Sequence, residues 1–318
     1  MAVNTKEIQT RIKSVKNTRK ITKAMEMVAA AKMRKAVEAA TQTRTYATLA
    51  WDLLVNLSKD QEVKLPLLEI REVKKILMVL VTSNRGLCGS FNSNIIKKTA
   101  TQLDDPKNIA KQKAGENTKE ITKDLEVDVI GVGKKGAEFA KKMNYNLISS
   151  FTDISDTPTM EDALLISKII LNEYENKKYD KAVVAYTDFK SVVNQEAKLR
   201  QVLPISEHDL EKMINELGAD EKEESKTKTE DKLNDYLFEP NKIEVLKVIL
   251  PRLVETQIYQ SLLESSASEH SSRMLAMRNA SDAADDMIKE LNLNFNKARQ
   301  AAITQEIAEI AGGAAALE

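Results

Sequence analysis

Three glycines, Gly131, Gly133 and Gly136, form a Gly-x-Gly-x-x-Gly pattern between an apolar run and a predicted helix. In dinucleotide-binding domains such glycines allow the backbone to approach a pyrophosphate at a helix N-terminus. Here the pattern follows the second predicted strand of its domain, and no acidic residue closes a recognisable ribose site, although Asp153 lies near the expected distance. The Ala-Glu pair after Gly136 excludes a phosphate-binding loop that ends in Lys and a hydroxyl residue. A tight structural turn is therefore favoured over a nucleotide site.

A second glycine-rich loop, Asn84–Gly89, holds the only cysteine, Cys88. A nucleophilic thiol needs a base within reach, but His208 lies in an acidic segment and His270 in a long predicted helix. A small buried thiol is therefore favoured over a catalytic one. One cysteine also excludes an internal disulfide and, with only two histidines, argues against a zinc site of the usual ligand types. We predict no catalytic residue, no bound cofactor and no metal site.

The glycine loops lie in a middle region whose apolar runs are short and rich in β-branched residues. All glycines except Gly312 and Gly313 lie between residues 86 and 218. Strands alternating with helices predict an α/β layer with a mostly parallel sheet. The predicted strands are 75–82, 127–132, 147–151 and 182–187, with a last extended pair near 195–203, and the predicted helices are 94–102, 134–143 and 160–174.

The two ends of the chain predict long helices instead. Residues 252–311 contain no glycine or proline, and one unbroken helix over them would be about 90 Å long at ~1.5 Å per residue. A compact globule of this chain length is only ~50 Å across, so we expect this helix to project. Its predicted apolar face is Met277, Ala280, Ala284, Met287, Leu291, Phe295, Ala298 and Ala302. Pro251 is expected to start or kink the helix.

The N-terminal segment, residues 1–65, also lacks glycine and proline and is rich in alanine. Its predicted helical face is Ile8, Ile12, Val15, Ile21, Met25 and Val28, and the helix should end before Pro66. The simplest geometry for two such helices at opposite ends of one chain is an antiparallel coiled coil.

Charge is balanced overall, with 48 basic and 48 acidic residues, but it is distributed unevenly. Residues 1–45 carry eleven basic and three acidic side chains, whereas residues 204–240 carry five basic and twelve acidic ones. Solvated faces are the ordinary explanation, and a basic arm that meets acidic partner surfaces is the alternative. Segments 104–124 and 218–234 are expected to be solvated additions. No apolar run is long enough for a membrane span, and the N-terminus lacks the apolar core of a signal peptide.

Three segments are specific enough to indicate a family. They read KITKAMEMVAAAKMR at 20–34, RGLCG at 85–89 and NKARQAAITQEIAEI at 296–310. Together they closely resemble the gamma subunit of the F-type (rotary) ATP synthase, in the family's order and spacing. The middle of the chain matches mainly in pattern, and neither addition carries the cysteine pair of the redox-regulated chloroplast form.

The resemblance implies a central stalk. The paired helices would pass through a ring of three alpha and three beta subunits, with the α/β domain below, against the epsilon subunit and the membrane c ring. Proton flow would turn the c ring and this subunit, which would drive each beta subunit through its nucleotide-binding states. ATP, ADP and Mg would bind on those partners and not on this chain. The resemblance implies a peripheral membrane protein on the cytoplasmic side of a bacterial inner membrane, without nucleic acid.

The matched motifs also imply particular contacts. Arg299, Gln300 and Thr304 match polar contacts to the beta and alpha loops around the upper stalk, and Glu309 would lie nearby. Met25 and Arg273 match positions that face the acidic lever of the beta subunit. Tyr236 and Glu239 are weaker candidates for the foot near epsilon and the c ring. Without the resemblance, each would be an ordinary solvent-facing residue.

We therefore predict an α/β protein in which a long antiparallel coiled coil of the N- and C-terminal helices joins a central Rossmann-like α/β domain with a mostly parallel sheet. The predicted parts are the helix 1–65, the α/β domain 73–205, the acidic linker 206–240 and the helix 241–318. Two alternatives stay open: a structural tether with a coiled coil and an α/β head, and an α/β enzyme whose glycine turn holds a nucleotide.

Overall fold

The computed structural model describes residues 5–58, 65–104, 113–114, 117–118, 125–205 and 241–315. These residues belong to two compact units. One comprises Met1–Ala31 with Arg273–Glu318, and the other comprises Lys32–Ser272. The expected additions at 104–124 and 218–234 lie largely outside the described residues, and a two-residue antiparallel ladder of β2 (Lys113–Ala114) and β3 (Asn117–Thr118) falls within the first of them.

The second unit contains a five-stranded sheet in the order β5-β4-β1-β6-β7. Four of its strands are parallel, and β7 pairs antiparallel with β6 at one edge. This confirms the predicted mostly parallel sheet. The strands are β1 (Lys75–Val81), β4 (Glu126–Val132), β5 (Asn146–Phe151), β6 (Lys181–Phe189) and β7 (Gln195–Leu203).

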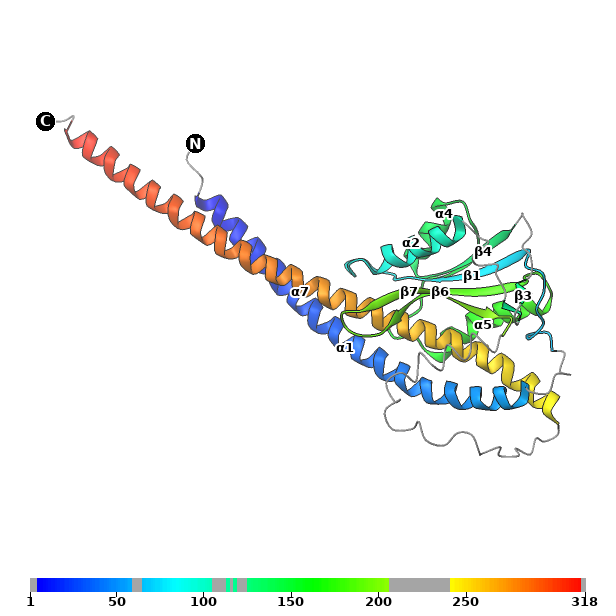
Figure 1. The fold of residues 1–318 in the computed structure, drawn as a ribbon. Coiled ribbons are helices and arrows are strands. Elements are labelled where there is room, and N and C mark those ends of the chain that lie inside the picture. Colours follow the sequence, from blue (N-terminus) through cyan, green and yellow to red (C-terminus); the bar gives the residue numbers. More distant parts are fainter. Residues whose placement is uncertain are drawn as a thin grey trace. The chain divides into compact units, whose positions relative to one another are not determined.

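Helices cover both faces of this sheet (Figure 1). One face carries α2 (Phe91–Asp104) and α4 (Lys134–Lys142). The other carries α5 (Met160–Glu175) and the N-terminal part of α7 (Lys242–Ala315). The predicted helices 94–102, 134–143 and 160–174 are therefore present, each with slightly different ends.

Strand β1 lies at the centre because its apolar side chains serve both faces. Leu77, Val79 and Val81 pack in the cluster beneath α5 and α7. The alternate residues Ile76, Met78 and Leu80 pack in the clusters beneath α2 and α4. Burying each such side chain stabilises the fold by about 1.5–3 kcal/mol relative to leaving it exposed. A continuous apolar run is thus required here, where an alternating one would leave one face polar.

In the first unit, the N-terminal part of α1 (Thr5–Ser58) and the C-terminal part of α7 pack side by side in antiparallel directions. Thr22 Oγ1 lies 2.7 Å from Ser281 Oγ, and Arg19 Nε lies 2.7 Å from Asp285 Oδ1. Toward the N-terminus of α1, the contacting residues of α7 lie progressively closer to its C-terminus, as antiparallel helices require. The predicted antiparallel pairing of the terminal helices is confirmed.

The contact between these helices follows seven-residue spacing. On α1 the inward positions Ile8, Val15, Thr22 and Ala29 are buried or half-buried. On α7 the inward positions alternate in steps of four and three residues, the pattern of a coiled-coil seam. They are Met277, Ser281, Ala284, Ile288, Leu291, Phe295 and Ala298.

Part of the predicted apolar faces was wrong. Ile21 is 60 % exposed, Val28 is 54 % exposed and Met287 is 44 % exposed. The buried neighbours are instead Thr22 and Ala29, at 9 % and 2 % exposure. The helices approach closely at small residues, and the larger side chains beside them point to solvent in this chain. A prediction based on large apolar residues therefore assigns the wrong face of α1 to the helix contact.

Pro251 lies inside α7 and does not start it, because the helix begins at Lys242. Of the two expectations for Pro251, a helix start is therefore wrong, and a kink stays a prediction. Proline lacks the N–H that would bond to the carbonyl four residues earlier, and its ring crowds that carbonyl. Burial compensates: Leu250, Leu253 and Val254 beside it belong to the core under the sheet. At the N-terminus, α1 is described to Ser58, short of Pro66.

The buried hydroxyl of Tyr174 predicts a loss of stability at alkaline pH. Burial raises the pKa of Tyr174 to about 12, and its hydroxyl lies 3.2 Å from the carbonyl oxygen of Glu69, to which it donates. The unfolded side chain would ionise near pH ~10. The unfolded state therefore loses its proton first, so the stabilisation is complete below pH ~10 and is lost as pH rises toward 12. We expect the urea midpoint of the full chain to decrease as the pH is raised from about 10 toward 12. The decrease should be less steep in Tyr174→Phe, which has no hydroxyl to ionise. Equal slopes would contradict this role.

Candidate functional site

The glycine turn lies between β4 and α4, and the loop directly after β1 packs into it. Three backbone N–H groups at the start of α4, the groups that a pyrophosphate would use, donate to the loop directly after β1. Lys134 N donates to Asn84 Oδ1 at 3.1 Å, Lys135 N to Ser83 O at 3.3 Å, and Gly136 N to Thr82 Oγ1 at 2.7 Å. The Thr82 hydroxyl in turn donates to Val132 O at 2.9 Å. Within the described chain, the phosphate position of the motif is taken by protein.

The glycines are needed because the two backbones lie so close. Gly133 has φ +83°, and a Cβ built on it would lie 2.2 Å from the carbonyl oxygen of Thr82. A Cβ on Gly136 would lie 3.0 Å from Thr82 Oγ1 and 3.3 Å from Leu80 O. The motif therefore serves strand-to-turn packing, as predicted. The residue that sequence reasoning missed is Thr82, whose only signal is a hydroxyl residue directly after the central strand.

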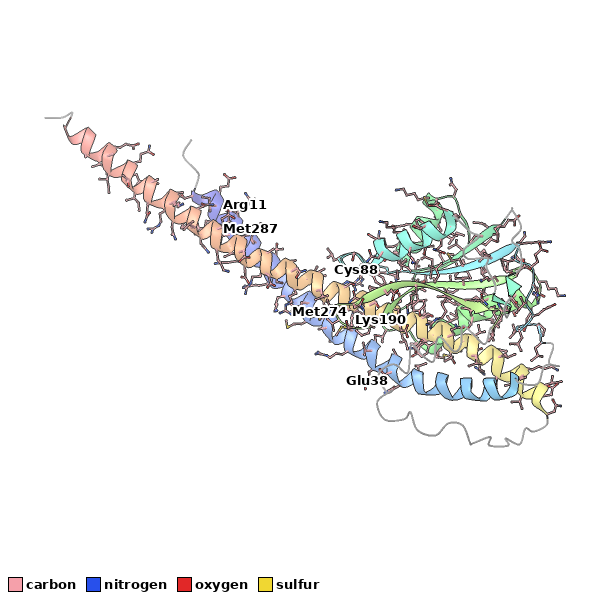
Figure 2. The ribbon with its side chains drawn as sticks, viewed as in Figure 1. Arg11, Glu38, Cys88, Lys190, Met274 and Met287 are labelled. Atoms are coloured by element: carbon pink, nitrogen blue, oxygen red, sulfur yellow. The ribbon has the colours of Figure 1, made fainter. Side chains whose placement is uncertain are left out.

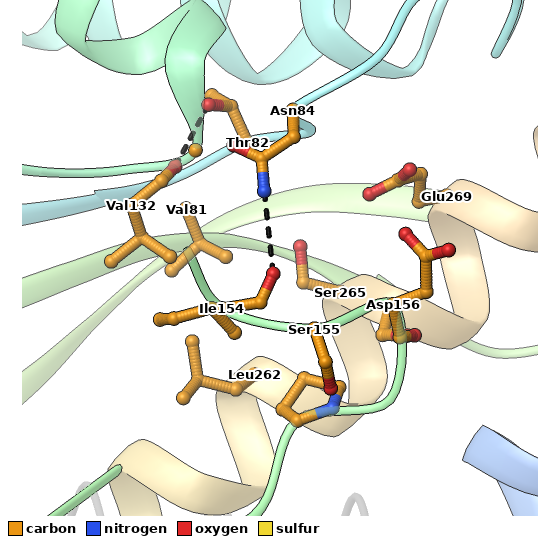
Figure 3. A pocket seen from close by; sticks show the side chains of 13 residues that line it. Val81, Thr82, Asn84, Val132, Ile154, Ser155, Asp156, Leu262, Ser265 and Glu269 are labelled. Atoms are coloured by element: carbon orange, nitrogen blue, oxygen red, sulfur yellow. Dashed lines mark hydrogen bonds between the residues drawn. The ribbon is translucent and has the colours of Figure 1, made fainter. Parts of the chain in front are cut away.

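The carboxyl ends of parallel strands are where open α/β sheets bind ligands. In this protein α7 crosses that region of the second unit: Ser268 Oγ donates to Thr187 O at 3.2 Å, and Ser271 Oγ donates to Val192 O at 2.8 Å. The cavity that remains has a volume of about 40 Å³, lined by the ends of β1 and β4, the loop after β5, and α7 (Figure 3). Small-molecule sites span about 300–1,000 Å³, so this cavity fits a water molecule or two and not a nucleotide.

Cys88 is buried, at 3 % exposure, in the turn before α2. Asn92 Nδ2 lies 3.2 Å from its sulfur, and that same amide bonds to Ser83. No carboxylate or imidazole contacts this sulfur among the described residues. His270 bonds elsewhere, with Nε2 3.0 Å from Asp156 O, and His208 lies outside the described residues. The geometry matches the predicted structural thiol.

In the part of the chain that the structure describes, no group of three His, Cys, Asp or Glu side chains could hold a metal ion. None of the described helices is long and apolar enough to cross a membrane.

The candidate partner-contact residues lie mainly on the exposed C-terminal part of α7. Arg299, Gln300, Thr304 and Glu309 all have exposed side chains. Thr304 Oγ1 donates to Gln300 O at 3.0 Å, and Gln305 Nε2 donates to Glu309 at 2.9 Å. These bonds lie within one helix, so the outward polar groups of Arg299 and Gln300 are available to another chain.

The other candidates are placed differently. Met25 on α1 is half-buried, and Arg273 on α7 is 9 % exposed. Arg273 is therefore not the solvent-facing residue that a simple surface contact would use, and its contact with a partner stays a prediction. Tyr236 and Glu239 lie outside the described residues.

The basic N-terminal block forms a groove in the first unit. Side chains of α1 line it together with Asp285 and Ile288 of α7. Arg11 of α1 and Met287 of α7 mark the two helices here (Figure 2). The cationic side chains that line the groove are Lys6, Lys13, Lys16, Arg19 and Lys20. Sequence reasoning predicted the basic block, and the fold places these residues along one groove.

Comparison with known proteins gives a consistent result. A family model described as ATP synthase matches residues 4–317. The ATP synthase gamma chain of Legionella pneumophila (strain Corby) is 38 % identical over 98 % of this chain and 99 % of its own length. The ATP synthase gamma chain of Chloroflexus aurantiacus (strain ATCC 29366 / DSM 635 / J-10-fl) is 40 % identical over 99 % of each chain.

Solved structures support the fold. A chain from the Euglena gracilis mitochondrial ATP synthase (OSCP/F1/c-ring, rotational state 3) matches with a TM-score of 0.63 and 20 % identity, covering 98 % of this chain and 94 % of that one. A chain from the central stalk and c ring of the Tetrahymena thermophila mitochondrial ATP synthase matches with a TM-score of 0.55 and 24 % identity, covering 82 % and 99 %. On the full-length sequence match, the chain belongs to the ATP synthase gamma chain family.

Proposed function

We propose that this chain is the central-stalk (rotor) subunit of an F-type ATP synthase and couples proton flow through a membrane c ring to ATP synthesis or hydrolysis on beta subunits. The observation that carries this proposal is the full-length similarity to ATP synthase gamma chains, at 38 % and 40 % identity. The likeness to rotor and central-stalk chains supports the same fold.

The helix pair suits the transmission of torque. Two helices that pack along a seven-residue seam resist twisting better than one helix alone. The hydroxyl pair Thr22–Ser281 adds a buried polar contact at one place in this seam. A polar contact in an apolar seam favours one register over its neighbours, which a shaft requires if its surface is to keep a fixed orientation.

The proposed contacts to the alpha and beta ring use exposed polar groups. Arg299, Gln300, Thr304 and Glu309 lie on the outside of α7. The basic groove on α1 is suited to acidic loops of the ring, because surface ion pairs are each worth only ~0–1 kcal/mol and can break at every step. Met25 and Arg273 are retained as candidates for the beta lever.

The proposal assigns no catalysis to this chain. ATP, ADP and Mg would bind on the partner subunits. The filled glycine turn, where Thr82 takes the position of a phosphate oxygen, supports this assignment. The foot would meet epsilon and the c ring, with Tyr236 and Glu239 as candidate contacts. We place the protein at the cytoplasmic face of a bacterial inner membrane, attached through partners.

The decisive experiment is native mass spectrometry of the tagged chain purified from gently solubilised membranes of its own source. One copy with three alpha-like and three beta-like partners, bound nucleotide and ATPase activity is the expected result. A monomer or homodimer without such partners would overturn the proposal and favour a structural tether. Calorimetric titration of the isolated chain with a dinucleotide should be flat, and saturable binding would instead favour the enzyme alternative.

A further inference from the structure

One residue of the second unit contacts both long helices. Asp156 lies in the loop between β5 and α5. Its carbonyl oxygen accepts a hydrogen bond from Ser266 Oγ at 2.7 Å and lies 3.0 Å from His270 Nε2. Ser266 and His270 are one turn apart on α7, so the loop sits on a single face of that helix. Figure 3 shows Asp156 beside α7, close to Glu269.

The carboxylate of the same residue reaches the other helix. Asp156 Oδ2 forms an ion pair with Lys32 Nζ of α1. This hydrogen bond with Lys32 is the main cause that lowers the pKa of Asp156. Backbone and side chain thus bond to different helices, and both helices are joined to one loop of the α/β domain.

The loop is itself fixed to the sheet. Asn84, just after β1, donates from Nδ2 to Ile154 O at 3.3 Å and accepts from Lys134 N at 3.1 Å. After the loop, Thr159 caps α5 in a capping box with Asp162. Asp156 is therefore held between two fixed points, the carboxyl edge of the sheet and the start of α5.

We propose that Asp156 is a positioning residue for rotary coupling: it fastens α1 and α7 to the α/β domain, so that torque on the domain passes to both helices together. The inference rests on the proposed rotor function. Both fastening points lie close to the residues at which the two units divide, Lys32 and Ser272. Lys32, Asp156, Ser266 and His270 all belong to the second unit, so the fastening itself lies within that unit.

The ion pair should matter more for coupling than for stability. Its side chains are 36 % and 37 % exposed, and ion pairs this exposed contribute little to the free energy of folding. Loss of the pair should therefore leave the chain folded. If the pair served only the stability of the fold, its loss would change proton pumping no more than it changes ATP hydrolysis.

The test compares Asp156→Lys, Lys32→Glu and the double exchange in the assembled complex, reconstituted in liposomes. We expect Asp156→Lys to keep ATP hydrolysis but to lower ATP-driven proton pumping per ATP by about threefold or more, because like charges now repel at the joint. The double exchange should restore at least half of the loss. The matched control is Lys75→Glu, which disrupts the exposed Lys75–Glu126 pair between β1 and β4 without involving either helix. It should pump normally.

Hydrogen exchange of the isolated full chain separates this inference from the rotor function itself. Asp156→Lys should speed exchange in the β5–α5 loop, the double exchange should slow it again, and Lys75→Glu should leave it unchanged. Unchanged exchange in Asp156→Lys would overturn the fastening. Faster exchange with normal pumping would overturn its role in coupling.

Should Asp156→Lys fail to assemble, Asp156→Asn removes the charge without repulsion and takes its place. If native mass spectrometry finds no ring partners, the rotor function fails while the exchange result still decides the fastening.

Discussion

Replacing Gly133 with alanine is expected to remove most of the soluble, folded protein. The alanine Cβ would lie 2.2 Å from Thr82 O, and φ is +83°. The three nearest atoms belong to the backbone of Thr82 and Ser83, so no side chain can rotate away. Overpacking of this kind costs about 1–3 kcal/mol or more. The backbone at Gly133, with φ 83° and ψ 153°, lies in a region almost restricted to glycine, which adds about 1–3 kcal/mol for alanine. The sum is a large part of a typical domain stability of about 5–15 kcal/mol.

Gly86→Ala is the matched control, because a Cβ at Gly86 has no heavy atom within 4 Å. We expect its stability to change by less than about 0.5 kcal/mol. Soluble yield and urea midpoints of the two variants and the parent chain make the comparison. A Gly133→Ala chain as stable as Gly86→Ala would mean that β1 and the glycine turn are not in this close contact.

The double variant Arg299→Ala with Gln300→Ala is expected to weaken coupling in the assembled complex by tenfold or more. Both side chains are exposed on α7, so the chain itself should remain folded. Hydrogen bonds to charged groups contribute about 1.5–3 kcal/mol each, and 1.4 kcal/mol corresponds to a factor of ten. ATP-driven proton pumping in liposomes, normalised to the amount of assembled complex, measures the loss.

Lys289→Ala serves as the control on the same helix. Its side chain is 78 % exposed and pairs only locally, with Asp286 at 2.9 Å. It should pump like the parent. Normal pumping in the Arg299 and Gln300 double variant would show that these residues do not grip the ring, while leaving the family assignment intact.

The apolar pattern was sufficient to predict most elements of the α/β layer. The run from Ile76 to Val81 is apolar at every position, so only a strand covered on both faces buries all of it. Strands 127–132 and 147–151 are present with one more residue at the N-terminal end. The direction of β7 could not be read locally, because antiparallel pairing with β6 depends on a tight turn at Ser191–Asn194 that brings the strand back.

The seam of the helix pair was predicted less well, since its closest contacts are made by small or polar residues. Thr22, Ala29 and Ser281 are buried, whereas Ile21 and Val28 are exposed. A hydrophobicity pattern gives weight to large side chains and misses positions where the absence of bulk allows two helices to approach. Seven-residue spacing on both helices is the better signal, but it becomes visible only when the partner helix is known.

Three specific motifs in the sequence were enough to indicate the family, and the residue pattern was enough to predict an α/β middle and helical ends. Those features follow from local pattern and composition. The residues that pack into the glycine turn and those that fasten the helices became apparent only in the folded chain. Thr82 and Gly136 are 54 residues apart, and Lys32 and Asp156 are 124 apart. The first pair forms because the sheet brings distant strand ends to one edge, and the second because α1 packs beside the loop after β5. No local rule of sequence specifies which side chains meet there.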